Sequence, residues 1–228
     1  MNTTELKIAG KHEIDRVYAI WRSITSGKEI IHVFGDSHAS VFSNYKTFLT
    51  YPVGSGTAYN LVNENSSTKA GKNILKALKR IPKSETLIFI FGEIDCRIHV
   101  YKQYREKSKK IKMENIIRRI IERYDSFIGS VKNEGHENII VSSVPPTSIQ
   151  KNKYGYKYYA PQKTRIWITK EFNRQLKRYC QANKIAFLDM HTEFETKEGI
   201  AKEEFRLDTT HLNKKILLQI ERQLGKLL

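Results

Sequence analysis

Short, nearly uninterrupted apolar runs alternate along this chain with longer stretches of helical periodicity. The runs are four to seven residues long and rich in β-branched and aromatic side chains, which is typical of strands buried on both faces. Such strands need a covering layer on each side, so the pattern predicts a parallel sheet between helices. The runs occupy residues 30–34, 47–53, 86–91, 138–144 and 185–188.

The stretches between the runs carry apolar residues three and four positions apart, which is the spacing of one helix face. We interpret these stripes as helix faces that pack on the core. Because strands and helices alternate, right-handed crossovers are expected, and the predicted fold class is α/β, a three-layer α/β/α sandwich with about five parallel strands. The stripes lie within residues 14–24, 74–78, 113–128, 168–179 and 216–224.

The chain has 228 residues, 39% of them apolar and 28% charged, which suits a soluble globular protein. We predict a single domain over residues 1–228, with residues 1–28 as a helical extension packed on it. The amino-terminal residues are polar and no apolar run is long enough to cross a bilayer, so we expect a cytoplasmic protein without membrane insertion. Cys96 and Cys180 are expected to be reduced thiols, with a catalytic cysteine as the alternative.

The net charge is +16, from 40 Lys and Arg against 24 Asp and Glu. Such an excess attracts anions, so an acidic substrate or donor, a nucleic acid and a simple compositional bias are all compatible with it. Nucleic acid is the least favoured of these partners, because no recognised nucleic-acid-binding module is present in the sequence.

Polar residues with catalytic chemistry follow the predicted strands. Gly35-Asp36-Ser37 comes after the first strand and Asp208-Thr209-Thr210-His211 precedes the last helix. In parallel sheets the carboxyl ends of the strands share one edge, where functional loops gather. A serine needs a base such as histidine to take its proton, and the histidine needs a carboxylate to fix its tautomer. Ser37 also enters a helix, where its backbone N–H is suited to a developing oxyanion.

With these blocks the sequence resembles the SGNH, or GDSL-like, hydrolase superfamily, over residues 30–215. The resemblance implies a flavodoxin-like α/β/α fold and a serine acyl-enzyme mechanism. Ser37 would be the nucleophile and one oxyanion donor, His211 the base and Asp208 its partner. Gly54 would supply a second oxyanion N–H, with Gly56 as the competing choice.

The third block departs from the family pattern. Gly92-Glu93-Ile94-Asp95 aligns with G-x-N-D, but Ile94 stands where the family has its oxyanion asparagine. Losing one such donor typically costs about 3 kcal/mol of barrier lowering. We suggest Arg97 as the replacement donor, with Glu93 anchoring it. The alternative is an ion pair that only braces the loop.

Residues 99–112 and 150–165 are interpreted as loops over the site. Tyrosine rings suit sugar rings, and basic side chains suit carboxylates or phosphates. A solvated surface loop and single-stranded nucleic acid are the alternatives. The candidate substrate-binding residues are His38, Glu93, Tyr154, Tyr156 and Arg165.

The sequence therefore predicts an esterase, deacetylase or O-acetyltransferase acting on O-acyl groups of a carbohydrate. The carbohydrate would be a surface polysaccharide or its precursor, and we favour one that carries anionic groups. No cofactor is required, although acetyl-CoA would be the donor of a transferase, and no metal site is predicted. A glycan-binding module that has lost efficient catalysis is the alternative, because Ile94 removes an oxyanion donor.

Overall fold

The computed structural model describes residues 16–27, 29–149, 152 and 155–228. Its centre is a five-stranded parallel sheet with strand order β2-β1-β3-β4-β5. Each strand lies within two residues of the apolar run that predicted it, and the predicted fold class is confirmed. The strands are β1 (Ile31–Gly35), β2 (Phe48–Pro52), β3 (Thr86–Ile90), β4 (Ile139–Ser142) and β5 (Ala186–Leu188).

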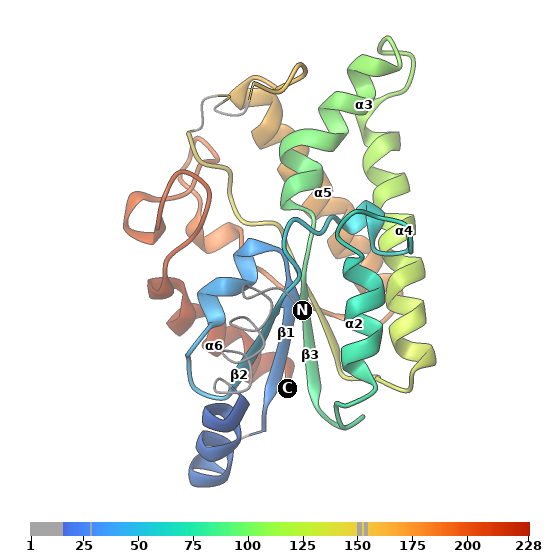
Figure 1. Ribbon diagram of the computed structural model, residues 1–228. Helices are drawn as coiled ribbons and strands as arrows, with labels where there is room; N and C mark the ends of the chain where they lie inside the picture. The colour runs from blue at the N-terminus through green and yellow to red at the C-terminus, as the bar shows by residue number, and fades with distance from the viewer. Residues whose placement is uncertain (1–15, 28, 150–151, 153–154) are drawn as a thin grey trace.

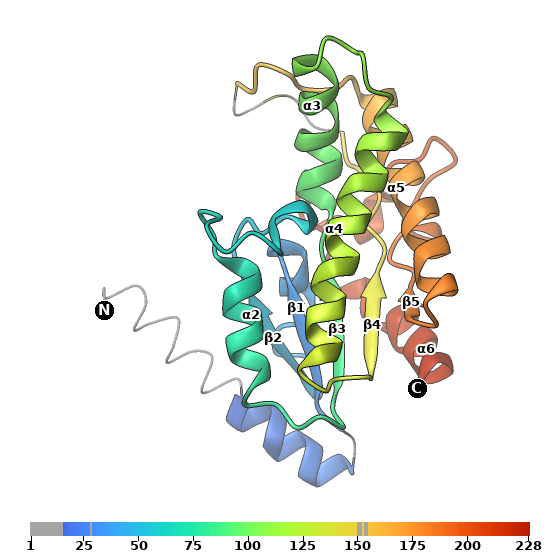
Figure 2. The same ribbon diagram turned by 90° about the vertical axis from the view of Figure 1, so that its right-hand side faces the viewer.

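Helices cover both faces of the sheet, as Figures 1 and 2 show. Alternate residues of a strand face opposite layers, so Phe34 and Phe89 join one core while Val33 and Ile88 join the other. The first core contains α2 (Ala70–Leu78), α4 (Met113–Asn133) and α5 (Gln162–Ala182). The second contains the 3₁₀ helix Ser37–Phe42 and α6 (Leu217–Leu227).

The segment expected to be the first loop over the site is mostly helical. A five-residue π-helix, Asp95–His99, leads directly into α3 (Val100–Glu106), which lies beside the upper part of α4 in Figure 2. Val100 is fully buried, and Tyr101 and Tyr104 pack against the core. The interpretation of residues 99–112 as a loop was wrong, because the many lysines conceal this short apolar spacing.

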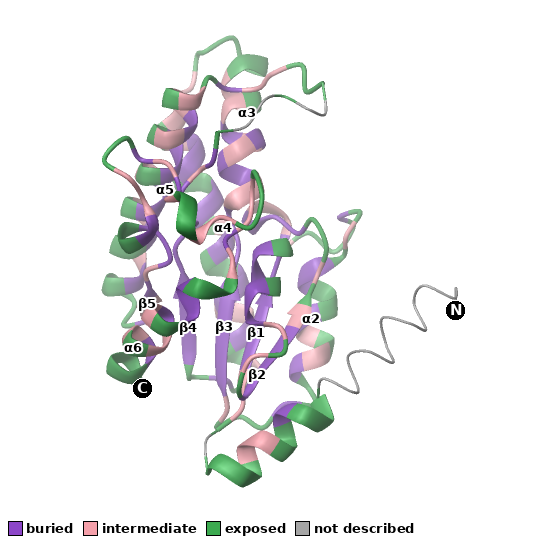
Figure 3. Ribbon diagram, turned by 90° about the vertical axis from the view of Figure 1, so that its left-hand side faces the viewer, coloured by how far each residue is buried: buried purple, intermediate pink, exposed green. Residues whose placement is uncertain are grey.

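The N-terminal helix also differs from expectation. Its described part covers residues 16–26, at the amino end of the sheet (Figure 3). Val17, Tyr18, Trp21 and Ile24 were interpreted as a core face, yet they are between 55% and 77% exposed, while Ala19 is buried. Both faces of the sheet are already covered by other helices, so this stripe does not enter the core. Residue 14 of the stripe lies outside the described residues.

Strands β1 and β3 approach closely where they end. A Cβ on Gly35 would lie 2.7 Å from the Ile90 carbonyl oxygen, and the backbone N–H of Asp36 donates to that same oxygen. Gly92, just beyond β3, has a φ of +117° and a Cβ there would lie 2.8 Å from the Phe172 ring. Because the chain leaves β1 and β3 on opposite sides of the sheet, a crevice opens between the two loops.

We predict that Gly92→Ala lowers the free energy of unfolding by about 3 kcal/mol, because it adds a strained positive φ to a steric clash. Gly129→Ala is the matched control. Gly129 lies inside α4 with no atom near its added Cβ, so alanine should raise stability by about 0.5–1 kcal/mol. Urea unfolding measures both, and equal effects of the two variants would contradict the prediction.

Candidate active site

The turn after β1 presents Ser37 to solvent. Ser37 is the first residue of the 3₁₀ helix Ser37–Phe42 and is exposed, whereas Asp36 and His38 on either side are buried. The Asp36 carboxylate caps the helix by accepting from the His38 backbone N–H at 2.9 Å. The local sequence thus holds the two flanking side chains inward and turns the serine hydroxyl outward.

The loop before α6 carries Asp208 and His211, which contact each other. One carboxylate oxygen of Asp208 accepts from the backbone N–H groups of Thr210 and His211, at 2.6 and 2.8 Å. The other oxygen lies 2.8 Å from His211 Nδ1. Burial alone would raise the Asp208 pKa, but the hydrogen bonds from His211 and from these backbone groups lower it to about 2. The carboxylate is therefore ionised near neutral pH and fixes a proton on Nδ1.

Ser37 and the His211 loop meet across the carboxyl edge of the sheet. Ser37 Oγ lies 2.8 Å from His211 Nε2, although the two residues are 174 positions apart in the sequence. Since Nδ1 carries the proton, Nε2 of the neutral ring is free to accept from the serine hydroxyl. Ser37, His211 and Asp208 form one continuous hydrogen-bonded chain, the arrangement that activates a serine nucleophile.

His38 ties the serine turn to the His211 loop from behind. Its Nδ1 lies 2.9 Å from the Asp36 carboxylate and its Nε2 lies 3.2 Å from the Thr210 carbonyl oxygen. Both partners only accept, so both nitrogens donate and the ring is an imidazolium. Burial lowers the His38 pKa, but the Asp36 carboxylate outweighs it and the pKa rises to about 9.

This geometry changes the interpretation of His38. We expected it to contact substrate, yet its side chain is only 2% exposed and both ring nitrogens are engaged by the protein. Its ring centroid lies 4.8 Å from that of His211. His38 thus supports the loop that carries the base, rather than offering a free hydrogen-bonding atom to a ligand.

The loop after β2 runs beside the serine turn. Gly35 of β1 pairs with Pro52 of β2, so Gly54 and Ser37 both lie two residues beyond a paired position. Gly54 has a φ of +66° and open space where a Cβ would be. Gly56, in contrast, packs against Val53, Ala70 and Phe91 and has no positive φ. The register places Gly54 level with Ser37, and the open space around Gly54 distinguishes it from the packed Gly56.

A buried carboxylate organises this loop. Asp95 is fully buried and accepts from the backbone N–H groups of Ala58 and Tyr59, at 2.8 and 3.4 Å. Burial raises the Asp95 pKa most, the two backbone donors oppose it, and the nearby Asp36 charge adds to it, giving about 7. Asp95 therefore links the loop after β3 to the loop after β2.

The third block contains the ion pair that the sequence suggested. Arg97 Nε donates to Glu93 Oε1 at 2.7 Å, and both side chains are largely buried. The second carboxylate oxygen of Glu93 is buried without a hydrogen-bond partner among the described residues. Arg97, Glu93, His38 and Thr210 line one small cavity. The pair lies beside the hydrogen-bonded chain from Ser37 to Asp208, while Ile94 offers no side-chain donor.

Residues 155–161, which carry Tyr156, Tyr158 and Tyr159, form a strap near this cavity. Arg165 is only 3% exposed and donates to the Ala160 carbonyl oxygen at 2.8 Å, and its guanidinium lies 4.6 Å from the centroid of the Tyr159 ring. It therefore fastens the strap to α5. Tyr156 is exposed and stacks on Tyr159, with centroids 6.4 Å apart. Tyr154 lies outside the described residues.

A groove of about 780 Å³ adjoins the third block. Tyr156, Tyr158 and Ile94 are among the residues that line it. The lining is also rich in hydroxyl and amide side chains, and Ser66 there has a buried hydroxyl without a partner among the described residues. These polar residues are Ser55, Thr57, Asn60, Asn63, Asn65, Ser66, Ser67 and Thr68.

The sequence alone did not predict which residues support the triad from behind. Asp36 and Asp95 stand inside the matched blocks, so the signal for them was present, but their roles depend on contacts between distant loops. Thr210 contributes a backbone carbonyl, for which its side chain gives no signal.

Cys96 and Cys180 are free and buried, and burial raises the pKa of both thiols, which disfavours a cysteine nucleophile.

Comparison with solved structures shows the fold of the GDSL-like hydrolases. A GDSL-like lipase of Bacteroides thetaiotaomicron is 14% identical, with a TM-score of 0.57 over 93% of this chain and 98% of that chain. An aryl esterase of M. smegmatis is 13% identical, with a TM-score of 0.57 over 88% and 100%. A member of the lipolytic G-D-S-L family from Veillonella parvula is 13% identical, with a TM-score of 0.54 over 88% and 98%. No protein-family model and no curated protein matches the sequence.

We predict that the stability lost in His38→Asn depends on pH. The folded pKa of His38, about 9, lies above the value of about 6.5 expected for the unfolded chain. The charged ring therefore stabilises the fold fully below pH 6.5, and this contribution disappears as pH rises to 9. The difference in unfolding free energy between parent and variant should be largest at pH 6 and shrink towards pH 9 in urea titrations. A difference independent of pH would contradict the assignment.

Proposed function

We propose that this chain, which has the fold of the GDSL-like hydrolases, is a serine-dependent acyl-transfer enzyme. The observation that carries the proposal is the hydrogen-bonded chain from Ser37 through His211 to Asp208, with both links at 2.8 Å. It lies at the crevice between the loops after β1 and β3, which is where ligands bind in sheets of this topology.

In the first half of the reaction Ser37 Oγ attacks the acyl carbonyl while its proton passes to His211 Nε2. The resulting imidazolium is stabilised by Asp208, which stays ionised because its pKa is about 2. The tetrahedral intermediate then expels the alcohol, which takes the proton from Nε2 and leaves an acyl group on Ser37.

The negative charge on the intermediate needs donors. The backbone N–H groups of Ser37 and Gly54 are proposed for this role, and the Asp95 bonds to residues 58 and 59 would keep the Gly54 loop in place. Arg97, held by Glu93 beside the triad, is proposed as the donor that replaces the family asparagine.

In the second half an acceptor hydroxyl attacks the acyl-serine, with His211 again as the base. Water as acceptor gives an esterase or deacetylase, and a sugar hydroxyl gives an O-acetyltransferase, in which case acetyl-CoA would serve as donor. The groove beside Ile94 supports a carbohydrate on either side of the reaction. Its hydroxyl and amide side chains match the polar edges of a sugar, and the Tyr156 and Tyr158 rings match its flat face.

The charge of the chain supports an anionic polysaccharide or precursor, since an excess of +16 favours negatively charged partners.

The proposed location remains the cytoplasm. Within the described ranges, no helix combines the length and apolar character that spanning a bilayer requires.

Hydrolysis of p-nitrophenyl acetate by the parent and by Ser37→Ala tests the proposal. The parent should release p-nitrophenol and acetate, and Ser37→Ala should lose nearly all of this rate. Ser126→Ala, an exposed serine on α4 far along the chain from the blocks, is the matched control and should behave like the parent. Equal rates for the parent and Ser37→Ala, with glycan binding retained in both, would favour the non-catalytic binding module. Candidate sugars added to the assay then show whether a hydroxyl captures the acetyl group.

We predict that Arg97→Gln lowers kcat by about 100-fold while KM changes little, because an oxyanion donor acts mainly in the transition state. Steady-state kinetics and a thermal melt are measured together. A melting temperature that falls together with the rate, with Glu93→Gln reproducing both effects, would show that Arg97 only braces the loop.

A further inference from the structure

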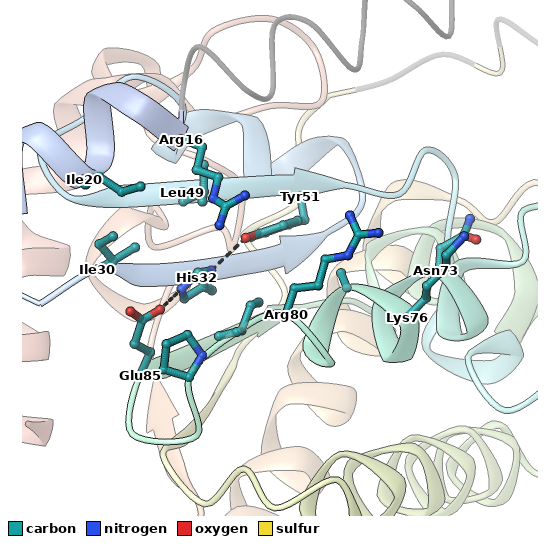
Figure 4. A pocket seen from close by; sticks show the side chains of 13 residues that line it. Arg16, Ile20, Ile30, His32, Leu49, Tyr51, Asn73, Lys76, Arg80 and Glu85 are labelled. Atoms are coloured by element: carbon teal, nitrogen blue, oxygen red, sulfur yellow. Dashed lines mark hydrogen bonds and ion pairs between the residues drawn. The ribbon is translucent and has the colours of Figure 1, made fainter. Parts of the chain in front are cut away.

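A second concave site lies at the other end of the sheet from Ser37. This pocket, which we call the basal pocket, has a volume of about 440 Å³ and is bordered by β2, α2 and the N-terminal helix. Its size falls within the range of small-molecule sites, about 300–1,000 Å³. Figure 4 shows side chains from these separate elements pointing into the same space. None of its residues takes part in the proposed acyl transfer.

The floor of the basal pocket is apolar. Ile20, Ile30, Leu49 and Ile81 line it, together with Ala77 and Pro82. One polar chain crosses it, in which Tyr51 and Glu85 both contact the His32 ring. Burial lowers the His32 pKa, although Glu85 opposes this. A neutral ring donates from Nε2 to the carboxylate and accepts the Tyr51 hydroxyl proton at Nδ1, so Glu85 is already engaged.

The rim of the pocket is basic. Arg16 reaches in from the N-terminal helix, and Lys76 and Arg80 reach in from α2 and its end. Among the described lining residues, Glu85 is the one carboxylate against these three cations. Lys76 and Arg80 make no side-chain hydrogen bond or ion pair with the described part of the chain. Unpaired cations around a concave surface attract anions more strongly than the same charges on a flat one.

We propose that the basal pocket binds a phosphate ester, with the phosphate between Arg80, Lys76 and Arg16 and an apolar body on the isoleucine-rich floor. Guanidinium groups match phosphate oxygens in a two-pronged geometry, and three cations suit a group that carries nearly two negative charges at neutral pH. A neutral ligand would leave Lys76 and Arg80 without an anionic partner, and an inorganic ion would leave the floor unused.

The phosphate ester has two chemical sources, a soluble phosphorylated molecule or a lipid headgroup. The second source fits the exposed apolar face of the N-terminal helix, since Arg16 and Ile20 line the pocket while Val17, Trp21 and Ile24 of the same helix face solvent. Aromatic and aliphatic side chains beside arginines are typical of helices that lie at a membrane surface. The experiment distinguishes the two sources.

Calorimetric titration with phenyl phosphate tests the soluble source. The parent should bind it saturably and more tightly than inorganic phosphate, because the phenyl ring covers the floor. Lys76→Gln and Arg80→Gln should each weaken binding by about tenfold, the loss of one charge-assisted contact. Lys79→Gln is the matched control, since this exposed lysine sits at the same helix end but does not line the pocket.

Sedimentation with vesicles tests the lipid source. Vesicles of phosphatidylcholine containing phosphatidic acid should retain the parent, and vesicles of phosphatidylcholine alone should not. Retention that is lost in the Lys76→Gln/Arg80→Gln double variant assigns the headgroup to the pocket. Absence of binding to both probes overturns the proposal, and so does an equal effect of Lys79→Gln. Turnover of p-nitrophenyl acetate should be unchanged in all four variants, so the result is independent of the proposed acyl transfer.

Discussion

The close contact between β1 and β3 constrains the whole carboxyl edge of the sheet. The two strands are neighbours although β2 lies between them in the sequence, and the Ile90 carbonyl lies where a side chain on Gly35 would have to be. Glycine at that point lets the two strands pair to their ends. After β1 and after β3 the chain then turns toward opposite faces of the sheet. Ser37 on one loop and the π-helix Asp95–His99 on the other are placed by this single constraint.

Buried ionisable side chains behind the site connect loops that the sheet alone would leave independent. The Asp36–His38 pair reaches the Thr210 carbonyl, and Asp95 reaches the backbone of residues 58 and 59. A buried polar or ionised group is costly unless it is hydrogen-bonded, so each of these groups has a strong preference for one arrangement. The exposed triad is thus supported by groups that are almost completely removed from solvent.

The basic side chains have different surroundings at the two ends of the sheet. Near the proposed active site, Arg97 and Arg165 are held by Glu93, by a backbone carbonyl and by the Tyr159 ring. At the amino end of the sheet, Lys76 and Arg80 face a pocket without such partners among the described residues. The same residue types therefore have partners within the protein at one end and lack such partners among the described residues at the other, and the difference lies in their neighbours.

Local patterns were sufficient for the strands, the parallel sheet and the Asp208–His211 turn, because burial on two faces and a three-residue spacing leave direct marks in the sequence. They also pointed to Ser37: Gly-Asp-Ser is a weak signal alone, and it gained weight from its place after a buried strand and from the family resemblance. They failed for α3, where lysines conceal the apolar spacing, and for the N-terminal helix, whose apolar stripe turned out to be exposed. Whether an apolar face is covered depends on which surfaces the rest of the fold leaves open. In the same way, His38 became a buried cation and Arg165 a buried fastener only through contacts with residues far away in the chain. The sequence by itself determined most of the elements and the pairs that lie a few residues apart, such as Glu93 with Arg97 and Asp208 with His211, because both depend on near neighbours. Only the tertiary structure decided which distant groups meet, such as His38 with the Thr210 carbonyl, because those contacts join residues that the chain keeps far apart.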